Sequence, residues 1–172
     1  MNAYSEAQRL RGRLAAPIDL TTIEVIRVQL EARTIPLSYG SHVRGWHPVR
    51  PGHGSIAFES KLEARLITRL AQLPELVSIV SQPITVHYRQ ADTCRRYTPD
   101  FLVELSSVPI ELAALGFGRR TLVEVKQLNR ALQAEANLVH QFAAACSATG
   151  HPIALVTQVD MSPEIREVRH AA

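Results

Sequence analysis

Three charged residues lie inside two apolar stretches of this sequence, where a buried strand normally carries no charge. Asp100 begins the stretch DFLV directly after a proline, and Glu124 and Lys126 lie within the stretch LVEVK. Because side chains alternate between the two faces of a strand, Glu124 and Lys126 share one face and the valines beside them share the other. Buried charges are costly unless they are paired or bind something charged. If the two stretches are neighbouring strands, Asp100, Glu124 and Lys126 meet at one point.

These residues suit the chemistry of a divalent cation and a phosphate. Two carboxylates offer the oxygen ligands that Mg²⁺ prefers, and we expect Mg²⁺ or Mn²⁺ there rather than a metal held by Cys and His. Lys126 would add a positive charge beside a scissile phosphate or an attacking hydroxide. Glu63, on the flank of an apolar helical stripe, could turn toward Asp100 and supply a third carboxylate. The plainer alternative is that Pro-Asp forms a turn and Glu-x-Lys a solvated or ion-paired strand face.

Length and composition indicate one globular domain in a reducing compartment. The chain has 172 residues, 20% of them charged, and a formal net charge of +3, which permits a polyanionic partner without requiring one. Its basic excess is mostly arginine, which suits phosphate geometry better than lysine. The two cysteines, Cys94 and Cys146, are predicted to be free thiols in the cytoplasm. No apolar stretch is long enough for a signal peptide or a membrane helix.

Hydrophobic periodicity predicts the elements that must position these residues. Helices are predicted over residues 1–16, 23–30, 56–73 and 129–147. Strands are predicted over residues 77–89, with a break at Gln82-Pro83, and over residues 97–103, 122–126 and 152–157. Residues 106–120 form a connection, and Gly150 is predicted to end the last helix.

The stretch 36–53 is rich in Gly, Ser, Pro and His, which predicts a loop. His47 and His53 have no further ligands at zinc-binding spacing, so they are predicted to be loop residues rather than metal ligands. Trp46 has two possible roles. Either it contacts a DNA backbone together with Arg44, or it anchors the loop on the core.

The order of these elements predicts an α/β fold with a central mixed sheet. A helix that connects the strand at 122–126 to the last strand implies that these two strands are parallel. The helix predicted at 56–73 and the strands predicted at 77–89 and 97–103 come before these two strands in the chain. The result is an αβββαβ core, in which helices flank both faces of the sheet.

Four short motifs, in this order, resemble a known family of nucleases. They are FESKLE at residues 58–63, SQP at 81–83, YTPDF at 97–101 and LVEVK at 122–126. The last two form the pattern of the PD-(D/E)XK nuclease superfamily, and the whole series is similar to the N-terminal catalytic domain of the TnsA family. These proteins are endonuclease subunits of heteromeric transposases. The resemblance covers residues 44–157.

The resemblance implies a restriction-endonuclease-like fold and a role for each matching residue. An N-terminal helical and loop segment, residues 1–43, would precede an endonuclease domain at residues 44–172, within a single globular unit. Glu63 would be the helix carboxylate, Asp100 and Glu124 the main metal ligands, and Glu63 and the carbonyl of Val125 further ligands. Lys126 would be the catalytic lysine.

Other residues would support the site or contact DNA. Gln82 matches the Gln-Pro element of the family, which we expect to support the site rather than take part in chemistry. Weak contacts to DNA are expected from Arg44, Arg95, Arg96 and Arg130.

The implied activity is metal-assisted phosphodiester hydrolysis, in which the enzyme nicks the 5′ strands at transposon ends. Bound Mg²⁺ would lower the pKa of a water and neutralise the charge that develops on the phosphate. The implied partners are DNA at the transposon ends, a DDE-type transposase subunit that processes the other strand, and an AAA+ regulator. Family members continue into a C-terminal helical domain that we do not find in this sequence, which leaves the partner interface open.

Three alternatives remain. The chain could be another nuclease of the superfamily, acting in restriction, repair or junction resolution. It could be a non-catalytic DNA-binding or assembly module that kept the fold, although such a module has no need of Asp100, Glu124 and Lys126 together. It could also be a structural protein with an ion-paired strand end. A transposase gene beside this one would discriminate among them.

Overall fold

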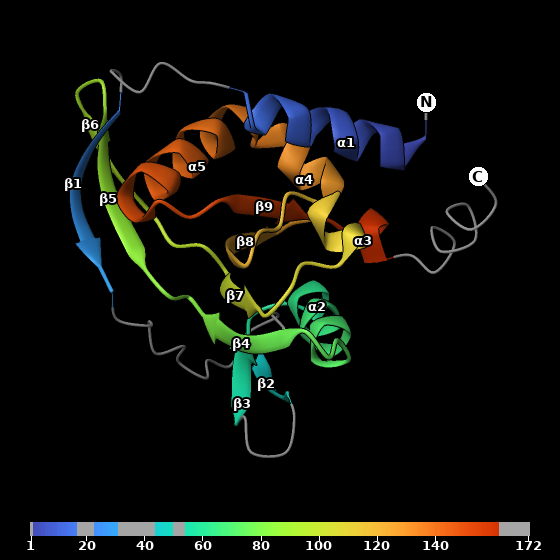
Figure 1. Ribbon diagram of the computed structural model, residues 1–172. Coiled ribbons are helices and arrows are strands. Elements are labelled where there is room, and N and C mark those ends of the chain that lie inside the picture. The colour runs from blue at the N-terminus through green and yellow to red at the C-terminus, as the bar shows by residue number, and fades with distance from the viewer. Residues whose placement is uncertain (1, 17–22, 31–43, 50–53, 162–172) are drawn as a thin grey trace.

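The computed structural model describes residues 2–16, 23–30, 44–49 and 54–161. These parts of the chain form a mixed α/β structure in which helices pack on three open sheets, one of them mixed (Figure 1). Within these residues, no helix is both long enough and apolar enough to cross a membrane. Both cysteines are free thiols, as predicted.

The central sheet contains the two stretches that carry the charged residues. Its strands are β4 (Leu76–Ser81), β7 (Phe101–Leu105), β8 (Arg120–Val125) and β9 (Ile153–Val156), in that order. Strand β7 is antiparallel to both of its neighbours, β4 and β8, whereas β8 and β9 are parallel. The predicted neighbouring position of β7 and β8, and the predicted parallel pair, are therefore confirmed.

Helices pack on the two faces of this sheet. Helix α2 (Lys61–Ala71) covers one face, and α1 (Ala3–Leu14), α4 (Leu128–Gln133) and α5 (Glu135–Thr149) lie on the other side (Figure 1). The predicted last helix is thus two helices, because the chain breaks at Ala134. Each helix supplies an apolar stripe that the sheet buries, since neither element can bury its apolar side alone.

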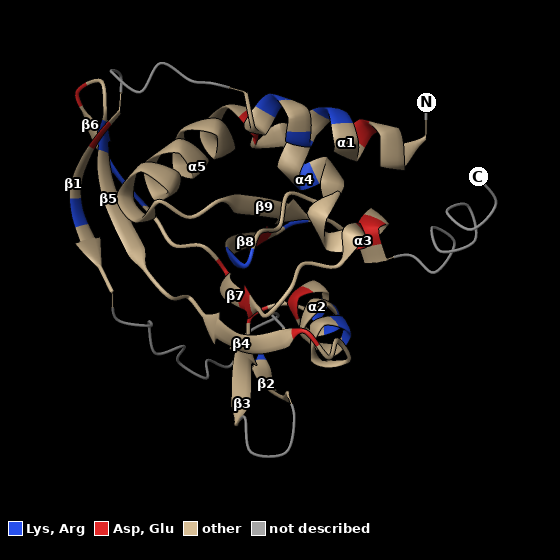
Figure 2. Ribbon diagram, viewed as in Figure 1, with Lys and Arg blue, Asp and Glu red and all other residues tan. Residues whose placement is uncertain are grey.

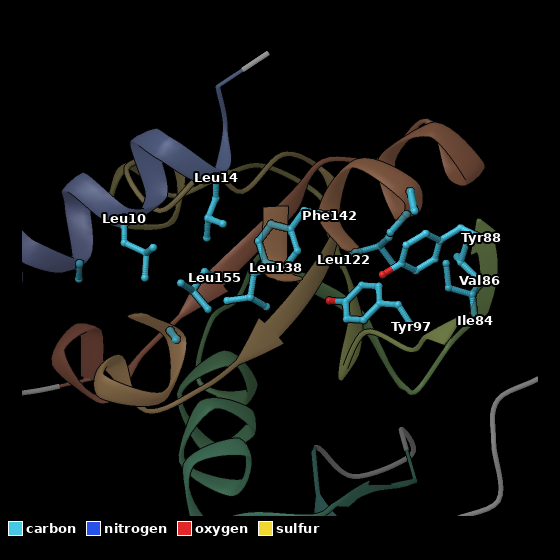
Figure 3. Close-up of a cluster of buried hydrophobic side chains, with 14 of the residues drawn as sticks. Leu10, Leu14, Ile84, Val86, Tyr88, Tyr97, Leu122, Leu138, Phe142 and Leu155 are labelled. Carbon is cyan, nitrogen blue, oxygen red and sulfur yellow. The ribbon is translucent and has the colours of Figure 1, made fainter. Parts of the chain in front are cut away.

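The alternation of side chains along β8 divides the core in two. Val123 and Val125 belong to the cluster that includes α2, whereas Leu122 belongs to the cluster that includes α1 and α5. Glu124 therefore shares the face of Leu122, as the period of two predicts. Figure 3 shows this second cluster, in which Tyr97 and Phe142 lie with their ring centroids 6.4 Å apart.

A second sheet corrects one prediction. Residues 23–30, expected to be a helix, form strand β1 (Ile23–Gln29), which pairs with β5 (Thr85–Gln90); β5 in turn pairs with β6 (Thr93–Tyr97). The β-branched residues of this stretch favour a strand. A bulge between Val25 and Arg27 interrupts the alternation that would have indicated a strand.

A small hairpin corrects two more boundaries. Strands β2 (Gly45–Pro48) and β3 (Ser55–Phe58) pair where a loop and the start of a helix were predicted. Trp46 is 60% exposed, so it does not anchor this segment on the core. His47 contacts Thr68, with 2.8 Å between Nε2 and Oγ1. His53 lies outside the described residues, so its predicted place in a loop stays a prediction.

Two of the remaining predicted strands are divided between the two larger sheets. The strand predicted at 97–103 is one of them: Tyr97 ends β6, and β7 begins only at Phe101. The predicted strand at 77–89 is two strands, β4 and β5, which belong to different sheets and separate at Gln82 and Pro83. The connection at 106–120 contains the short helix α3 (Ile110–Ala113). Gly150 ends α5 with φ of 69°, a left-handed conformation that glycine adopts without strain.

The described parts of residues 1–43 belong to the same core as the rest. Leu10 and Leu14 of α1 point toward Leu155 of β9 (Figure 3). Beside them, the guanidinium of Arg11 forms a buried ion pair with Asp160, in a short 3₁₀ helix at Gln158–Met161, and its Nε donates to the carbonyl of Leu155 at 2.9 Å. Helix α1 is therefore fixed both by apolar burial and by this ion pair.

Candidate active site

The pairing of β7 with β8 sets Asp100 beside Glu124. Phe101 pairs with Val123, so Asp100, one residue before β7, lies level with Glu124. The Oδ2 atom of Asp100 accepts a hydrogen bond from the backbone N–H of Val125 at 2.7 Å. This bond joins the loop before β7 to the end of β8 and fixes the direction of the Asp100 carboxylate.

Glu124 is buried, with 5% of its surface exposed, and both of its carboxylate oxygens have partners. Lys126 Nζ lies 2.7 Å from Oε1, and the hydroxyl of Tyr97 donates to Oε2 at 2.8 Å. The structure therefore brings together the three residues that the sequence placed on adjoining strands.

Lys126 stays protonated in this position. Burial opposes its charge, but the negative charges of Glu124, Asp100 and Glu63, with the hydrogen bond to Glu124, outweigh burial and raise the pKa of Lys126. The lysine is therefore a cation at neutral pH, able to attract an anion and unable to act as a general base.

Tyr97 is a site residue that the sequence did not identify. It comes from β6, in the other sheet, and its hydroxyl reaches Glu124 across the buried cluster that includes α5. Burial, followed by the charges of Glu124 and Asp100, raises its pKa well above the usual value, so it remains a hydrogen-bond donor. No local signal in the sequence points to this contact, because it depends on how two sheets pack.

Glu63 occupies the first turn of α2 and caps the helix. Ser60 is the N-cap residue, and its hydroxyl donates to Oε1 of Glu63 at 2.7 Å while accepting from the Glu63 N–H at 3.1 Å. The backbone N–H of Glu59 donates to Oε2 of Glu63 at 2.8 Å. This is a variant of the capping box in which the Glu59 N–H replaces the N-cap N–H, and the sequence Ser-x-x-Glu could have revealed it. Burial is the main cause that raises the pKa of Glu63.

The three carboxylates concentrate negative charge around Asp100. Burial, then the charges of Glu124 and Glu63, raise the pKa of Asp100 well above its usual range, although the Val125 N–H and Lys126 act in the opposite direction. A proton or a cation would relieve this repulsion. Glu63 therefore acts on Asp100 through its charge, although its oxygens face its own helix.

The donor set fits a hard cation with two carboxylate ligands. Within the described residues, Oδ1 of Asp100 accepts no hydrogen bond, and the facing carboxylate of Glu124 has oxygen atoms of the kind that Mg²⁺ prefers. Among the same residues there is no group of three or more His, Cys, Asp or Glu arranged for a metal. The backbone N–H of Val125 contacts Asp100 at this site, and the role of its carbonyl as a metal ligand stays a prediction.

Gln82 connects the start of α2 to Asp100. Its backbone N–H donates to the carbonyl of Asp100 at 2.8 Å, and its Nε2 donates to Oε2 of Glu59 at 3.0 Å. Its φ of 46° is a left-handed conformation that costs about 1–3 kcal/mol outside glycine. Two tertiary contacts therefore hold a strained residue beside the carboxylates, and its supporting role stays a prediction.

The four arginines predicted to contact DNA do not form one group. Arg44 lies beside Glu59, with 3.3 Å between Nη2 and Oε1. Arg95 and Arg96 are exposed on β6, and Arg130 is exposed on α4. Figure 2 shows β6 and α4 separated by the length of α5.

No protein-family model matches this chain, and no curated protein matches it at a significant level.

Proposed function

We propose that this chain is a Mg²⁺-dependent DNA endonuclease of the PD-(D/E)XK type. The observation that carries the proposal is the placement of Asp100 beside Glu124 on neighbouring strands, with Lys126 contacting Glu124. Following the resemblance, the proposed substrate is DNA at transposon ends, nicked on the 5′ strand in the cytoplasm. The proposed partners are a DDE-type transposase subunit and an AAA+ regulator.

The order of the elements supports a restriction-endonuclease-like core. Helix α2 is followed by β4, β7 and β8, then by α4 with α5, and finally by β9. Omitting the excursion through β5 and β6, this is the order αβββαβ, with two antiparallel pairs and one parallel pair. The charged residues lie where β7 begins and β8 ends.

In the proposed mechanism, Asp100 and Glu124 would hold Mg²⁺ or Mn²⁺, which when bound would supply an activated water and polarise the phosphate. Tyr97 keeps Glu124 in place, and the Val125 N–H directs Asp100. Lys126, as a cation, stabilises the attacking hydroxide or the charge that develops on the phosphate oxygens. Glu63 keeps the helix end folded and adds negative charge that favours a cation at Asp100.

The test compares Asp100→Ala with a matched control, Glu104→Ala, which removes a carboxylate from the other end of β7. Calorimetry should show Mg²⁺ binding by the wild type and the control and none by Asp100→Ala. Nicking of supercoiled plasmid should follow the same pattern, with Ca²⁺ bound but inactive. Equal Mg²⁺ binding by all three proteins would remove Asp100 from the site and with it the proposed mechanism.

A structural role is the second candidate, and one observation favours it. All four carboxylate oxygens of Glu124 and Glu63 are engaged within the protein. On this reading, the ion pair of Glu124 with Lys126 only closes the end of β8. The two readings predict opposite results for Lys126→Ala, which would lose cleavage in the first and the folded state in the second.

A further inference from the structure

The sheet formed by β1, β5 and β6 has one face that no described element covers. Its inner face packs on α5 through Val86 and Tyr88. Figure 1 shows the sheet at one side of the molecule, with α5 on its inner face only. Side chains alternate, so the residues between these buried positions project outward.

Strand register places the outward residues in rows. One row is Arg27, His87 and Arg96, because His87 pairs with Arg27 on one side and with Arg96 on the other. Both arginines are exposed, and in the described part of the chain neither forms an ion pair. Neighbouring strands are about 4.8 Å apart, so the row is about 10 Å wide, which covers about three nucleotides of one DNA strand.

The rows on either side of this one contain further hydrogen-bonding groups. Toward the tip of the sheet, Arg89 pairs with Glu24 and with Cys94. In the other direction, the hydroxyls of Thr85 and Thr98 lie 2.7 Å apart. The rows described on this face therefore carry three arginines, Arg27, Arg89 and Arg96, and one glutamate. That glutamate, Glu24, already forms an ion pair with Arg89 at 2.6 Å.

A short segment of the chain connects this face to Asp100. The chain runs from Arg96 through Thr98 to Asp100, a distance of at most about 13 Å for four extended residues. The three residues between Arg96 and Asp100 in the chain, Tyr97, Thr98 and Pro99, carry no charge. Arg95 points to the opposite face of β6, because it pairs with the buried Tyr88. Of the two adjacent arginines, Arg96 is therefore the one on the path.

We propose that this outer face, defined by Arg27, Thr85, His87, Arg96 and Thr98, binds the phosphate backbone of duplex DNA and directs it toward Asp100. The inference rests on the proposed nuclease function and names the surface that serves it. Arginine and hydroxyl donors match phosphate oxygens, and a row of such donors positions a duplex without reading its bases. The face therefore supplies affinity and register, while sequence preference comes from elsewhere.

Binding of a fluorescein-labelled 30-base-pair duplex of arbitrary sequence, in EDTA, tests the surface without chemistry. The variant Arg27→Gln/Arg96→Gln should lower the slope of log affinity against log salt by about 1.8, since each phosphate contact contributes about 0.9. That loss corresponds to an affinity about 30-fold weaker at 0.15 M salt, relative to a reference at 1 M. The variant Arg27→Lys/Arg96→Lys keeps the charges and should keep the slope.

A matched control is Arg119→Gln/Arg120→Gln, which removes two exposed arginines at the far end of β8 from Glu124. It should retain wild-type affinity. A second measurement uses the exposed thiol of Cys94, on the same face: duplex DNA should slow its alkylation by a maleimide in the wild type, while the half-buried Cys146 is unaffected. Thermal unfolding of each variant excludes loss of the fold as the cause.

Each outcome decides the surface separately from the nuclease. If the wild type cleaves DNA and the two double Gln variants bind DNA equally well, the proposed DNA-binding surface is rejected and the proposed nuclease activity is kept. If no protein cleaves DNA, but only Arg27→Gln/Arg96→Gln loses DNA binding and the protection of Cys94, the DNA-binding surface is supported and the nuclease activity is rejected. If that variant self-associates with unchanged DNA affinity, the arginines protect the open edge of β6, and the proposal is overturned.

Discussion

Replacing Asp100 with asparagine should make the metal-free protein more stable while abolishing its activity. The ionised carboxylate of Asp100 is opposed by burial and by the charges of Glu124 and Glu63, which is why its pKa is raised. Asparagine removes the charge but keeps an oxygen that can accept the N–H of Val125, a bond of 2.7 Å in the wild type. The substitution therefore removes the repulsion and retains the local hydrogen bond.

The size of the gain follows from the strand geometry. Side chains that lie opposite each other on antiparallel strands have Cβ atoms about 5 Å apart. Two negative charges at about 5 Å repel by about 3 kcal/mol at an effective dielectric constant of about 20. The attraction of Asp100 to Lys126 offsets part of this, so we expect a net gain of about 1–2 kcal/mol. For a protein of this length, the gain corresponds to a rise in Tm of about 2–8 °C.

The pH dependence gives the sign of the effect. The pKa of Asp100 is higher in the folded than in the unfolded state, so between these two values the folded protein holds more protons. Wild-type stability should therefore fall as the pH rises from about 4 through the raised pKa of Asp100. In Asp100→Asn this fall should be reduced, so the two proteins should converge near pH 4 and diverge toward neutral pH.

Urea unfolding in EDTA, from pH 4 to pH 8, measures these differences. Glu104→Gln on the same strand is the matched control and should show no gain that grows with pH. Mg²⁺ at 100 times its Kd should then stabilise the wild type by about 2.7 kcal/mol and leave Asp100→Asn unchanged. The reasoning is refuted if Asp100→Asn is less stable than the wild type at neutral pH, or if their difference does not vary with pH.

Three substitutions test the rest of the site, and one assay tests the dependence on a partner. Lys126→Ala should abolish plasmid nicking and retain the fold and most DNA affinity, since one lysine is one phosphate contact; an unfolded circular dichroism spectrum would show that its ion pair is structural instead. Tyr97→Phe should cost about 1–3 kcal/mol in urea unfolding and lower kcat more than it changes KM, because it leaves a buried oxygen of Glu124 without a donor; unchanged stability and kcat would contradict this. Ser60→Ala should cost about 1 kcal/mol by removing the cap of α2 and one partner of Glu63, and an unchanged urea midpoint would show that Glu63 alone caps the helix. The purified protein should cut labelled transposon ends at physiological salt only when a cognate DDE-type transposase is added, whereas site-specific cutting by the protein alone would favour a restriction enzyme.

The central strands could be predicted because their signals are local. In the stretch around Glu124, apolar and charged residues alternate, and that alternation survives in the fold as the division between the two clusters. The parallel pairing of β8 and β9 followed from the helical stretch between them. Both inferences need only the period of a strand and the length of a connection.

The errors arose where sequence periodicity was ambiguous or where partners are distant in the chain. Residues 23–30 were assigned to a helix because the bulge at Val25 and Arg27 disguises a strand. The contact of Tyr97 with Glu124 joins residues 27 positions apart in different sheets, which no local pattern encodes. The N-cap role of Ser60 was present in the sequence as Ser-x-x-Glu. The helix was nevertheless predicted to begin at Ile56, before Ser60, because the apolar residues from Ile56 onward were read as part of its stripe.

The buried pairing of Arg11 with Asp160 has a consequence for how the chain is made. The two residues are 149 positions apart, so at about 5–20 residues per second a ribosome needs about 7–30 s to synthesise the second after the first. During that interval α1, a helix of 12 residues that is marginal in isolation, has neither α5 nor β9 to cover Leu10 and Leu14. Helix α1 therefore reaches its final contacts only after α5 and β9 have been made, and until then its apolar side chains are open to a chaperone or a protease.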